Sequence, residues 1–253
     1  MTGKSIYGIS FFALALLFVG CERNMVPVQP PLQPIGPGTG LYIVYQNYFP
    51  IGTAMNAKTQ LTNTQLMNFI PTQYNSITPE NHMKPLYLQP QQSVFDWKFA
   101  DSTVAYARRN NMKVRGHALV WQQSMPAWFW RDATGNLVTK AELLSRMRTH
   151  IEAVVGRYKS DVYCWDVVNE AISNSNSVNE IYRPIDTLHQ IAGEDYVEMA
   201  FRYARAADSK AKLYYNDYRF SNPVKRQKII DMLARLLAKG TPIDGVGLQS
   251  HYI

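Results

Sequence analysis

Short apolar runs alternate with longer amphipathic segments from Gly40 onward in this chain of 253 residues. The strand-like runs are Pro50–Ala54, Ser76–Thr78, Lys113–His117, Val162–Asn169, Lys212–Asn216 and Gly245–Gln249. The helical segments between them are Asn63–Phe69, Trp97–Asn110, Lys140–Tyr158, Glu194–Ala207 and Val224–Lys239. Apolar residues recur at helical spacing in the last of these segments. Strands that alternate with helices predict a parallel α/β sheet.

Six strand-helix units fit two architectures, an open doubly wound sheet or six-eighths of a (β/α)8 barrel. A nucleotide-binding doubly wound sheet carries a glycine-rich phosphate loop after its first strand. Here the corresponding segment is Gly52-Thr53-Ala54-Met55, which lacks the required glycines. The sequence therefore disfavours nucleotide binding, while the periodicity alone leaves both architectures open.

The composition is that of a globular protein with one sizeable core, since 46% of residues are hydrophobic and 18% are charged. The formal net charge is +7. However, no run of Lys and Arg reaches the five or more residues typical of a basic tract, so we expect no nucleic-acid partner. The 16 Tyr and 5 Trp residues suit a sugar-binding cleft, but such rings are also ordinary packing residues.

The N-terminus has the organisation of an export signal. Lys4 precedes an apolar run from Ile6 to Val19, and Gly20-Cys21 follows it. The run has about 14 residues, short of the roughly 20 that a membrane-spanning helix needs. Leu17-Phe18-Val19-Gly20-Cys21 resembles a bacterial lipobox, with Cys21 as the lipidated residue. We expect a signal over 1–21 and a lipid anchor in the outer membrane or cell surface; ordinary secretion is the alternative.

A Pro- and Gly-rich stretch over 22–40 is predicted to be an extended tether, because such a composition cannot bury a core. The folded part is then expected over 41–253. The second of the two cysteines, Cys164, lies within an apolar run and is interpreted as a small buried residue. Two cysteines so far apart form no metal site, and we expect neither a metal ion nor a cofactor.

Polar side chains follow the ends of five of the predicted strands. In chain order these ends are Thr78-Pro79-Glu80-Asn81-His82-Met83-Lys84, Arg115-Gly116-His117, Asp166-Val167-Val168-Asn169-Glu170, Tyr215-Asn216-Asp217-Tyr218 and Gln249-Ser250-His251-Tyr252. Turns alone would favour Gly, Asn and Asp at such places rather than repeated His, Gln and Glu. Because the carboxyl ends of parallel barrel strands meet at one face, the pattern indicates a shared active site.

These segments resemble the strand motifs of glycoside hydrolase family 10 xylanases over about 41–253. The matching stretches are Tyr74–Lys84, Lys113–Trp121, Trp165–Ala171, Leu213–Tyr218 and Ile243–His251, in order and at suitable spacing. The resemblance implies a (β/α)8 TIM barrel, incomplete here with about six of eight strand-helix units. It also implies an endo-1,4-β-xylanase that acts on xylan and xylo-oligosaccharides with retention of configuration. We expect it to be a monomer.

The resemblance assigns a role to each matching position. Glu170 is expected to be the general acid/base, and Asn169 to bind the sugar 2-hydroxyl beside the scissile bond. The pocket around the cleavage point is expected to be lined by His117, Trp121, Gln249 and His251. The next sugar toward the non-reducing end is expected to hydrogen-bond with Glu80, Asn81 and Lys84.

Retaining hydrolysis needs two carboxyl groups about 5–5.5 Å apart, one acid/base and one nucleophile. The acid must hold a proton near neutral pH, which requires burial or a neighbouring anion. Glu170 suits this role because it follows the apolar run of the fourth strand. The family places its nucleophile Glu at the end of a seventh strand, so we expect that residue beyond Ile253. Residues 1–253 alone are accordingly expected to be a C-terminally truncated fragment without activity that folds poorly.

Some positions depart from the family pattern: His82 replaces a residue that is usually acidic, and Pro85 replaces a usual Trp. Gln122-Gln123-Ser124 follows Trp121 in place of His-x-Gln, so a sugar-contacting Gln is expected at 122 or 123. Two other functions stay open. One is another retaining barrel β-glycanase, such as a cellulase or a β-1,3-xylanase. The other is a non-catalytic surface lipoprotein that binds xylan.

Overall fold

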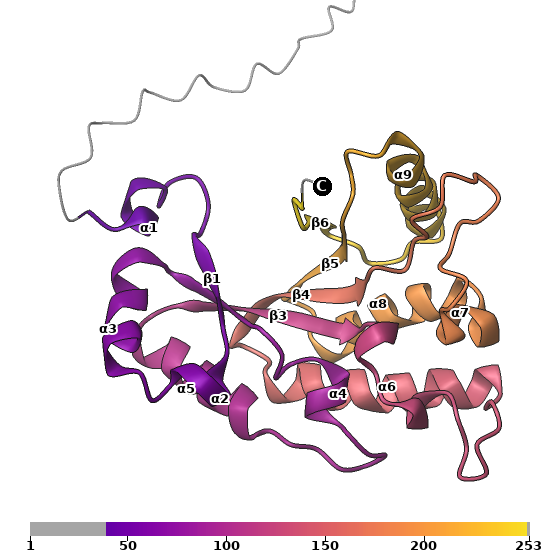
Figure 1. Cartoon of the computed structure of the whole chain (residues 1–253), viewed down its shortest axis with the longest axis horizontal. Coiled ribbons are helices and arrows are strands. Elements are labelled where there is room, and N and C mark those ends of the chain that lie inside the picture. Colours follow the sequence, from indigo (N-terminus) through magenta and orange to yellow (C-terminus); the bar gives the residue numbers. More distant parts are fainter. Residues whose placement is uncertain (1–38, 252–253) are drawn as a thin grey trace, which may run out of the picture. The chain divides into compact units, whose positions relative to one another are not determined.

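A six-stranded parallel sheet organises residues 39–251, the part of the chain that the structure, a computed structural model, describes (Figure 1). The strands are β1 (Gly52–Met55), β2 (Ser76–Pro79), β3 (Lys113–Val120), β4 (Val162–Asn169), β5 (Lys212–Asp217) and β6 (Gly245–Leu248). Each strand pairs in parallel with the strand that follows it in the sequence. The spatial order is therefore β1-β2-β3-β4-β5-β6.

This order decides between the two architectures that the sequence leaves open. A doubly wound sheet reverses its winding direction, so its first strand lies inside the sheet. Here β1 and β6 are the outer strands of the described sheet, and the winding never reverses. Consecutive parallel strands joined by helices are the pattern of a (β/α)8 barrel. The prediction of an incomplete barrel with six strand-helix units is confirmed, and the doubly wound alternative is wrong.

Long amphipathic helices cover the sheet and close its core. They are α3 (Thr64–Gln73), α5 (Lys98–Arg109), α6 (Lys140–Arg157), α8 (Asp195–Ala207) and α9 (Pro223–Ala238). Figure 1 shows α5, α6 and α8 along one side of the sheet, and α6 packs against α8. The buried face of α6 carries Leu143, Met147 and Ile151, and that of α8 carries Val197 and Phe201. Burial of these apolar faces is the main favourable contribution to folding.

The sequence periodicity missed several short elements. These are α1 (Leu41–Val44), α2 (Ala57–Gln60), α4 (Pro85–Leu88), α7 (Thr187–Ala192) and the 3-10 turns η1 (Gln122–Ser124) and η2 (Ala127–Phe129). Elements of three to six residues are too short to display a helical period. The strands and long helices all appear where predicted: β4 has the predicted bounds, and no end of another element differs by more than four residues.

Helix α3 runs beyond its predicted end at Phe69 because the chain compensates for an internal proline. Pro71 lies inside the helix and has no N–H for the carbonyl four residues earlier, that of Met67. The hydroxyl of Tyr106 on α5 donates to this carbonyl oxygen at 2.6 Å instead. A side chain from another helix thus replaces the missing backbone hydrogen bond, a contact that local sequence cannot reveal.

Two glycines allow neighbouring strands to pack closely. A methyl group at Gly116 on β3 would overlap the indole ring of Trp165 on β4, which is 1% exposed. A methyl group at Gly247 on β6 would overlap Oδ1 of Asn216 on β5. Large side chains on β4 and β5 therefore occupy the space that side chains on β3 and β6 would otherwise need.

The expectations for the N-terminus fall outside this part of the chain. The predicted signal over 1–21, Cys21 and nearly all of the tether over 22–40 lie outside the described residues. None of the helices among residues 39–251 combines the length and the apolar character needed to cross a bilayer.

His150 is an ionisable residue sealed inside the core. It lies on α6, is 1% exposed, and its Nδ1 lies 2.9 Å from Oε1 of Gln89. Burial lowers the pKa of His150 from 6.5 to about 3, so the imidazole is neutral in the folded protein. The unfolded chain binds a proton on this residue at higher pH than the folded chain does. The contribution of His150 to stability is therefore fully present above pH 6.5 and is lost as the pH falls toward 3.

We expect His150→Gln to reduce the acid sensitivity of the complete protein. Linkage predicts that between pH 7 and pH 5 the wild type loses about 2 kcal/mol of unfolding free energy through this residue, a loss the variant cannot show. Urea unfolding at both pH values measures the difference. His251→Gln, which removes an exposed imidazole, is the control. Equal losses in wild type and His150→Gln would show that the core does not exclude the protonated ring.

Candidate active site

The ends of all six strands surround one cavity of about 730 Å³. Seven of the predicted site residues line it: Glu80, His117, Trp121, Asn169, Glu170, Gln249 and His251. Asn81 and Lys84 lie beside it, since Lys84 Nζ donates to Asn81 Oδ1 at 2.9 Å and stands 5.1 Å from the ring centre of Trp121. The structure therefore brings together every residue that the sequence assigned to the site within the described part of the chain.

Glu170 follows β4 in a backbone conformation that few residues adopt. Its φ is +58°, in the left-handed region that is unfavourable for residues other than Gly, Asn and Asp. Its N–H donates to the Asn216 carbonyl at 2.9 Å. The next two N–H groups, of Ala171 and Ile172, donate to the Tyr215 hydroxyl at 3.2 and 3.3 Å. Strand β5 thus holds the chain on both sides of Glu170, which offsets the local strain.

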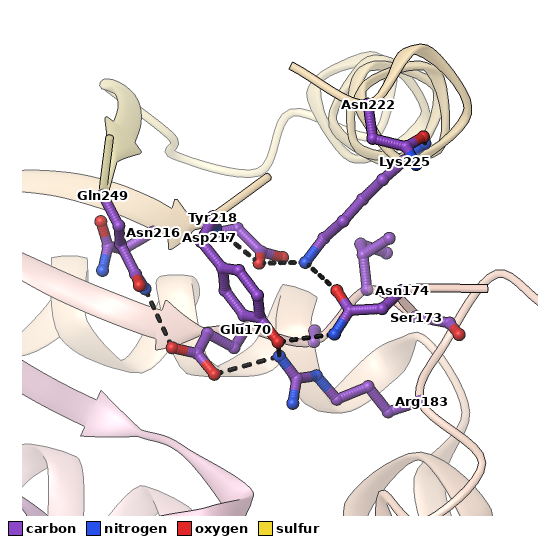
Figure 2. Close-up of polar contacts among 12 residues, drawn as sticks. Glu170, Ser173, Asn174, Arg183, Asn216, Asp217, Tyr218, Asn222, Lys225 and Gln249 are labelled. Carbon is purple, nitrogen blue, oxygen red and sulfur yellow. Dashed lines mark hydrogen bonds and ion pairs between the residues drawn. The ribbon is translucent and has the colours of Figure 1, made fainter. Parts of the chain in front are cut away.

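The carboxylate of Glu170 is held at both oxygens. Oε1 accepts a hydrogen bond from Gln249 Nε2 at 3.0 Å, and Oε2 accepts one from Arg183 Nη2 at 3.0 Å. The Glu170 side chain is 11% exposed and that of Arg183 is 12% exposed. Figure 2 shows Glu170 between these two partners, which come from opposite sides of the site. The arrangement fixes the direction of the carboxylate while leaving part of it open to the cavity.

Asn169 supplies a hydrogen-bond donor beside Glu170. Its Oδ1 accepts from Asn216 Nδ2 at 2.7 Å and from Gln249 Nε2 at 3.3 Å. The buried Nδ2 of Asn169 has no partner among the described residues, and neither has the buried Nε1 of Trp121. Buried polar groups are nearly always hydrogen-bonded, so two unsatisfied donors at the edge of one cavity indicate a ligand that carries acceptor oxygens.

His117 is oriented by a buried carboxylate. Asp166 on β4 is 1% exposed, and its Oδ2 lies 2.7 Å from both His117 Nδ1 and Arg115 Nη2. The carboxylate accepts a hydrogen bond from a proton on Nδ1, which leaves His117 Nε2 as the ring nitrogen available to the cavity. Asp166 on β4 thus fixes the ring orientation and the tautomer of His117 on β3.

Lys84, which follows β2, places an ammonium group near the Trp121 ring at the edge of the cavity. Burial lowers the pKa of its ammonium group, while the carboxylates of Glu80 and Glu170 partly oppose this change. With Asn81 Oδ1 on one proton and the Trp121 ring nearby, Lys84 retains N–H donors for further acceptors. Glu80 is exposed at the rim.

A second cluster of charges lies behind Glu170. Lys225 on α9 is 1% exposed, and its Nζ lies 2.7 Å from Oδ1 of the fully buried Asp217. Burial raises the pKa of Asp217 and lowers that of Lys225, and in each case the opposite charge of the partner counters the effect. Oδ2 of Asp217 accepts a hydrogen bond from the Tyr215 hydroxyl, with 2.5 Å between the two oxygens. This proton assignment leaves the Tyr215 oxygen as the acceptor for the backbone that follows Glu170.

Sequence reasoning missed several residues of the hydrogen-bond network around Glu170. Arg183 and Asn174 lie in the irregular segment between β4 and α7, where no periodic signal exists. Tyr218 and Asn216 stood in a recognised strand-end motif but had no predicted role. Neither Gln122 nor Gln123 is among the residues that line the cavity, so a sugar contact from either stays a prediction. His82 is buried against Tyr87 and Phe99 rather than lining the cavity.

Among residues 39–251, no group of three or more His, Cys, Asp and Glu side chains is placed to hold a metal ion. The chemistry that this region offers is accordingly that of a partly buried carboxylate, an oriented imidazole, an ammonium group and several amide donors.

Comparison with known proteins identifies relatives over the described part of the chain. The family profile described as glycosyl hydrolase family 10 matches residues 40–253. An endo-1,4-beta-xylanase A of a Caldicellulosiruptor strain is 46% identical over 213 residues, which cover 82% of this chain and 31% of the relative. The endo-1,4-beta-xylanase of Geobacillus stearothermophilus is 43% identical over 211 residues, covering 83% of this chain and 61% of the relative.

Solved structures agree with these matches. A psychrophilic family 10 endo-beta-1,4-xylanase superposes with a TM-score of 0.81 at 41% identity, covering 85% of this chain and 66% of the other. Xylanase XynB of Paenibacillus barcinonensis gives a TM-score of 0.79 at 41% identity, covering 84% and 62%. The chain spans between about a fifth and three fifths of the length of the curated relatives that it matches.

We expect Asp166→Asn to destabilise the complete protein by about 1–3 kcal/mol, because it removes the buried carboxylate that binds both Arg115 and His117. The cost stays below that of a fully buried pair, since the Arg115 side chain is 36% exposed and keeps part of its hydration. The matched control is Asp161→Asn, which removes the partner of Arg108, an arginine that is 67% exposed. The control should unfold like the wild type, since exposed ion pairs contribute little. Chemical unfolding of the three proteins measures the effect. Similar midpoints for all of them would mean that the contacts of Asp166 contribute nothing to stability.

Proposed function

Because the chain belongs to glycosyl hydrolase family 10, we propose that the protein is an endo-1,4-β-xylanase that hydrolyses internal bonds of xylan with retention of configuration. The substrate class follows from the relatives, which are named as xylanases. The reaction follows from the family resemblance and from the residues around the cavity. Because the chain covers only part of the length of its relatives, the activity of the complete protein is a proposal.

The observation that carries the proposal is the setting of Glu170. A partly buried carboxylate faces a cavity next to two buried N–H donors without partners, Asn169 Nδ2 and Trp121 Nε1. A sugar presents both a glycosidic oxygen that needs a proton and hydroxyl oxygens that accept hydrogen bonds. Hydroxyl oxygens of a bound sugar would give both donors the partners that buried N–H groups normally have.

In the proposed reaction Glu170 acts twice. It first donates a proton to the leaving glycosidic oxygen, and it then removes a proton from the water that releases the sugar. The hydrogen bonds from Gln249 and Arg183 to its two oxygens fix the direction of the carboxyl group for both steps. The resemblance places the nucleophile on a seventh strand, and we assign that role to no carboxylate among residues 39–251.

The other predicted residues would bind the sugar chain. Asn169 Nδ2 would donate to the 2-hydroxyl beside the scissile bond, where a hydrogen bond strengthens in the transition state. His117, Gln249 and His251 would surround the same sugar. Lys84, Asn81 and Glu80 would hydrogen-bond with the next one, and Trp121 would pack against the sugar chain.

We expect Glu170→Gln in the complete protein to lower kcat/KM on xylan by about 100- to 10,000-fold, the usual contribution of a general acid. An aryl xylobioside with a dinitrophenolate leaving group needs no protonation, so its kcat/KM should change little. Reducing-sugar release and absorbance of the phenolate measure the two rates.

Glu152→Gln is the matched control for this substitution, because Glu152 forms an exposed ion pair with Arg148 on α6. It should behave like the wild type on both substrates. Normal xylan hydrolysis by Glu170→Gln would show that Glu170 is not the general acid/base. A wild type that binds xylan without cutting it would favour the alternative of a non-catalytic binding protein.

We also propose that the mature protein is anchored to a bacterial outer membrane or cell surface through a lipid on Cys21. The support is the order of features in the sequence: Lys4, the apolar run to Val19, the lipobox-like Leu17–Cys21 and the Pro-rich tether. Lipid on Cys21 would hold the catalytic unit near the surface while the tether keeps it in contact with a polymer outside.

We expect Cys21→Ser to abolish fatty-acid labelling and to move the exported protein from the detergent phase to the aqueous phase, because the thioether to the lipid cannot form. Metabolic labelling and detergent phase partition in a Gram-negative host measure this. Cys164→Ala, which changes the other cysteine, should keep the label. A wild type without label that appears in the medium would instead support ordinary secretion.

A further inference from the structure

We propose that Asn174 is a positioning residue for Glu170, acting through the hydroxyl of Tyr218 and the guanidinium of Arg183, and itself oriented by buried Lys225. This inference rests on the proposed acid/base role of Glu170. The chain of contacts is drawn in Figure 2, where Lys225 reaches down from α9 to Asn174 and Asp217. None of the steps in the proposed reaction uses Asn174 or Lys225 directly.

The orientation of the Asn174 amide is determined by its neighbour. Lys225 Nζ lies 2.8 Å from Asn174 Oδ1. An ammonium group has donors only, so the amide must turn its oxygen toward Lys225. The amide nitrogen then faces Tyr218, and Nδ2 donates to the Tyr218 hydroxyl oxygen at 2.6 Å. The position of a charge on α9 thus decides which end of Asn174 meets Tyr218.

Tyr218 passes this constraint on to Arg183. Its hydroxyl oxygen accepts a second hydrogen bond, from Arg183 Nη2 at 3.2 Å. The same Nη2 donates to Glu170 Oε2 at 3.0 Å. Arginine is also a pure donor, so the hydroxyl must offer an acceptor lone pair to both neighbours and direct its own proton elsewhere. The donor that fixes one oxygen of Glu170 is therefore held in place by an oxygen that Asn174 has oriented.

Lys225, the residue of this hydrogen-bond series most distant from Glu170, is held in place by several contacts. Lys225 is held by Asp217 at 2.7 Å and lies 3.9 Å from the centre of the Tyr218 ring. Lys228, one turn later on α9, donates to the carbonyl oxygens of Ser175 and Glu180 at 2.8 and 2.7 Å. The irregular segment that carries Asn174 is thereby fastened to a helix, so it can serve as a fixed reference for the side chains that face Glu170.

The experiment compares Asn174→Asp with wild type in the complete protein. The aspartate keeps the size of the side chain and an acceptor for Lys225, but it offers no N–H to Tyr218. It instead attracts the hydroxyl proton and draws Arg183 away from Glu170. We expect kcat/KM on xylan to fall by about tenfold or more, the effect of about one hydrogen bond. On the dinitrophenyl xylobioside it should stay within about threefold, because that leaving group needs no acid.

Asn176→Asp is the matched control. It makes the same chemical change two residues away at an exposed side chain whose Oδ1 only accepts, from Asn222 Nδ2 at 2.9 Å. It should keep wild-type rates on both substrates. Circular dichroism and thermal unfolding of each variant exclude a general loss of structure as the cause of a reduced rate.

A double variant tests whether the effect passes through the hydroxyl. Tyr218→Phe removes that oxygen and should itself lower the xylan rate. Adding Asn174→Asp to it should cause no further loss, because the two changes interrupt one path. Multiplying losses would overturn the proposed route through Tyr218.

The outcomes separate this inference from the function on which it rests. If wild type and Asn176→Asp cleave neither substrate, the proposed function is wrong and the role of Asn174 falls with it. If both cleave the two substrates but Asn174→Asp loses rate equally on each, or loses none, only the positioning role is wrong. A loss confined to xylan, absent from the control and not increased in the double variant, supports it.

Discussion

The parallel register of β4 against β5 is the constraint on which the candidate site depends. It places Asn169 opposite Asn216, so that the two amides bond at 2.7 Å and the Asn216 carbonyl receives the N–H of Glu170 at 2.9 Å. A slip of one residue would turn alternate side chains to the other face of the sheet. It would also break the hydrogen bond from the Glu170 N–H to Asn216, which supports the left-handed backbone of Glu170.

Two ion pairs with buried carboxylates flank this register, Asp166 with the part-exposed Arg115 and Asp217 with the buried Lys225. Such pairs contribute little net stability, because the loss of hydration of both charges opposes their attraction. Their effect is on geometry instead. A buried carboxylate accepts hydrogen bonds only from donors that reach it, so Asp166 selects the state of His117, and Asp217 selects the direction of the Tyr215 proton. The site therefore depends on two carboxylates, Asp166 and Asp217, that do not line its cavity.

The elements that could be predicted from the sequence are those with a regular spacing of apolar residues. Strands and long helices repeat every two or 3.6 residues, so their order and the polar residues at strand ends, Glu170 and His117 among them, follow from the sequence. Arg183 and Asn174 were not predictable, because their segment has no period and its path is set by Lys225 and Lys228 on α9. The extension of α3 past Pro71 was missed for the same reason: its compensating donor, Tyr106, comes from another helix.

The overlap that a side chain at Gly116 would have with the ring of Trp165 has an evolutionary consequence. Neither position can change in size alone without a clash or a void. Drift between distant family members should therefore proceed at these two places by joint exchange, a larger residue on one strand accompanying a smaller one on its neighbour. The inner surface of the sheet would then diverge as coupled pairs, while the exposed helix faces vary residue by residue.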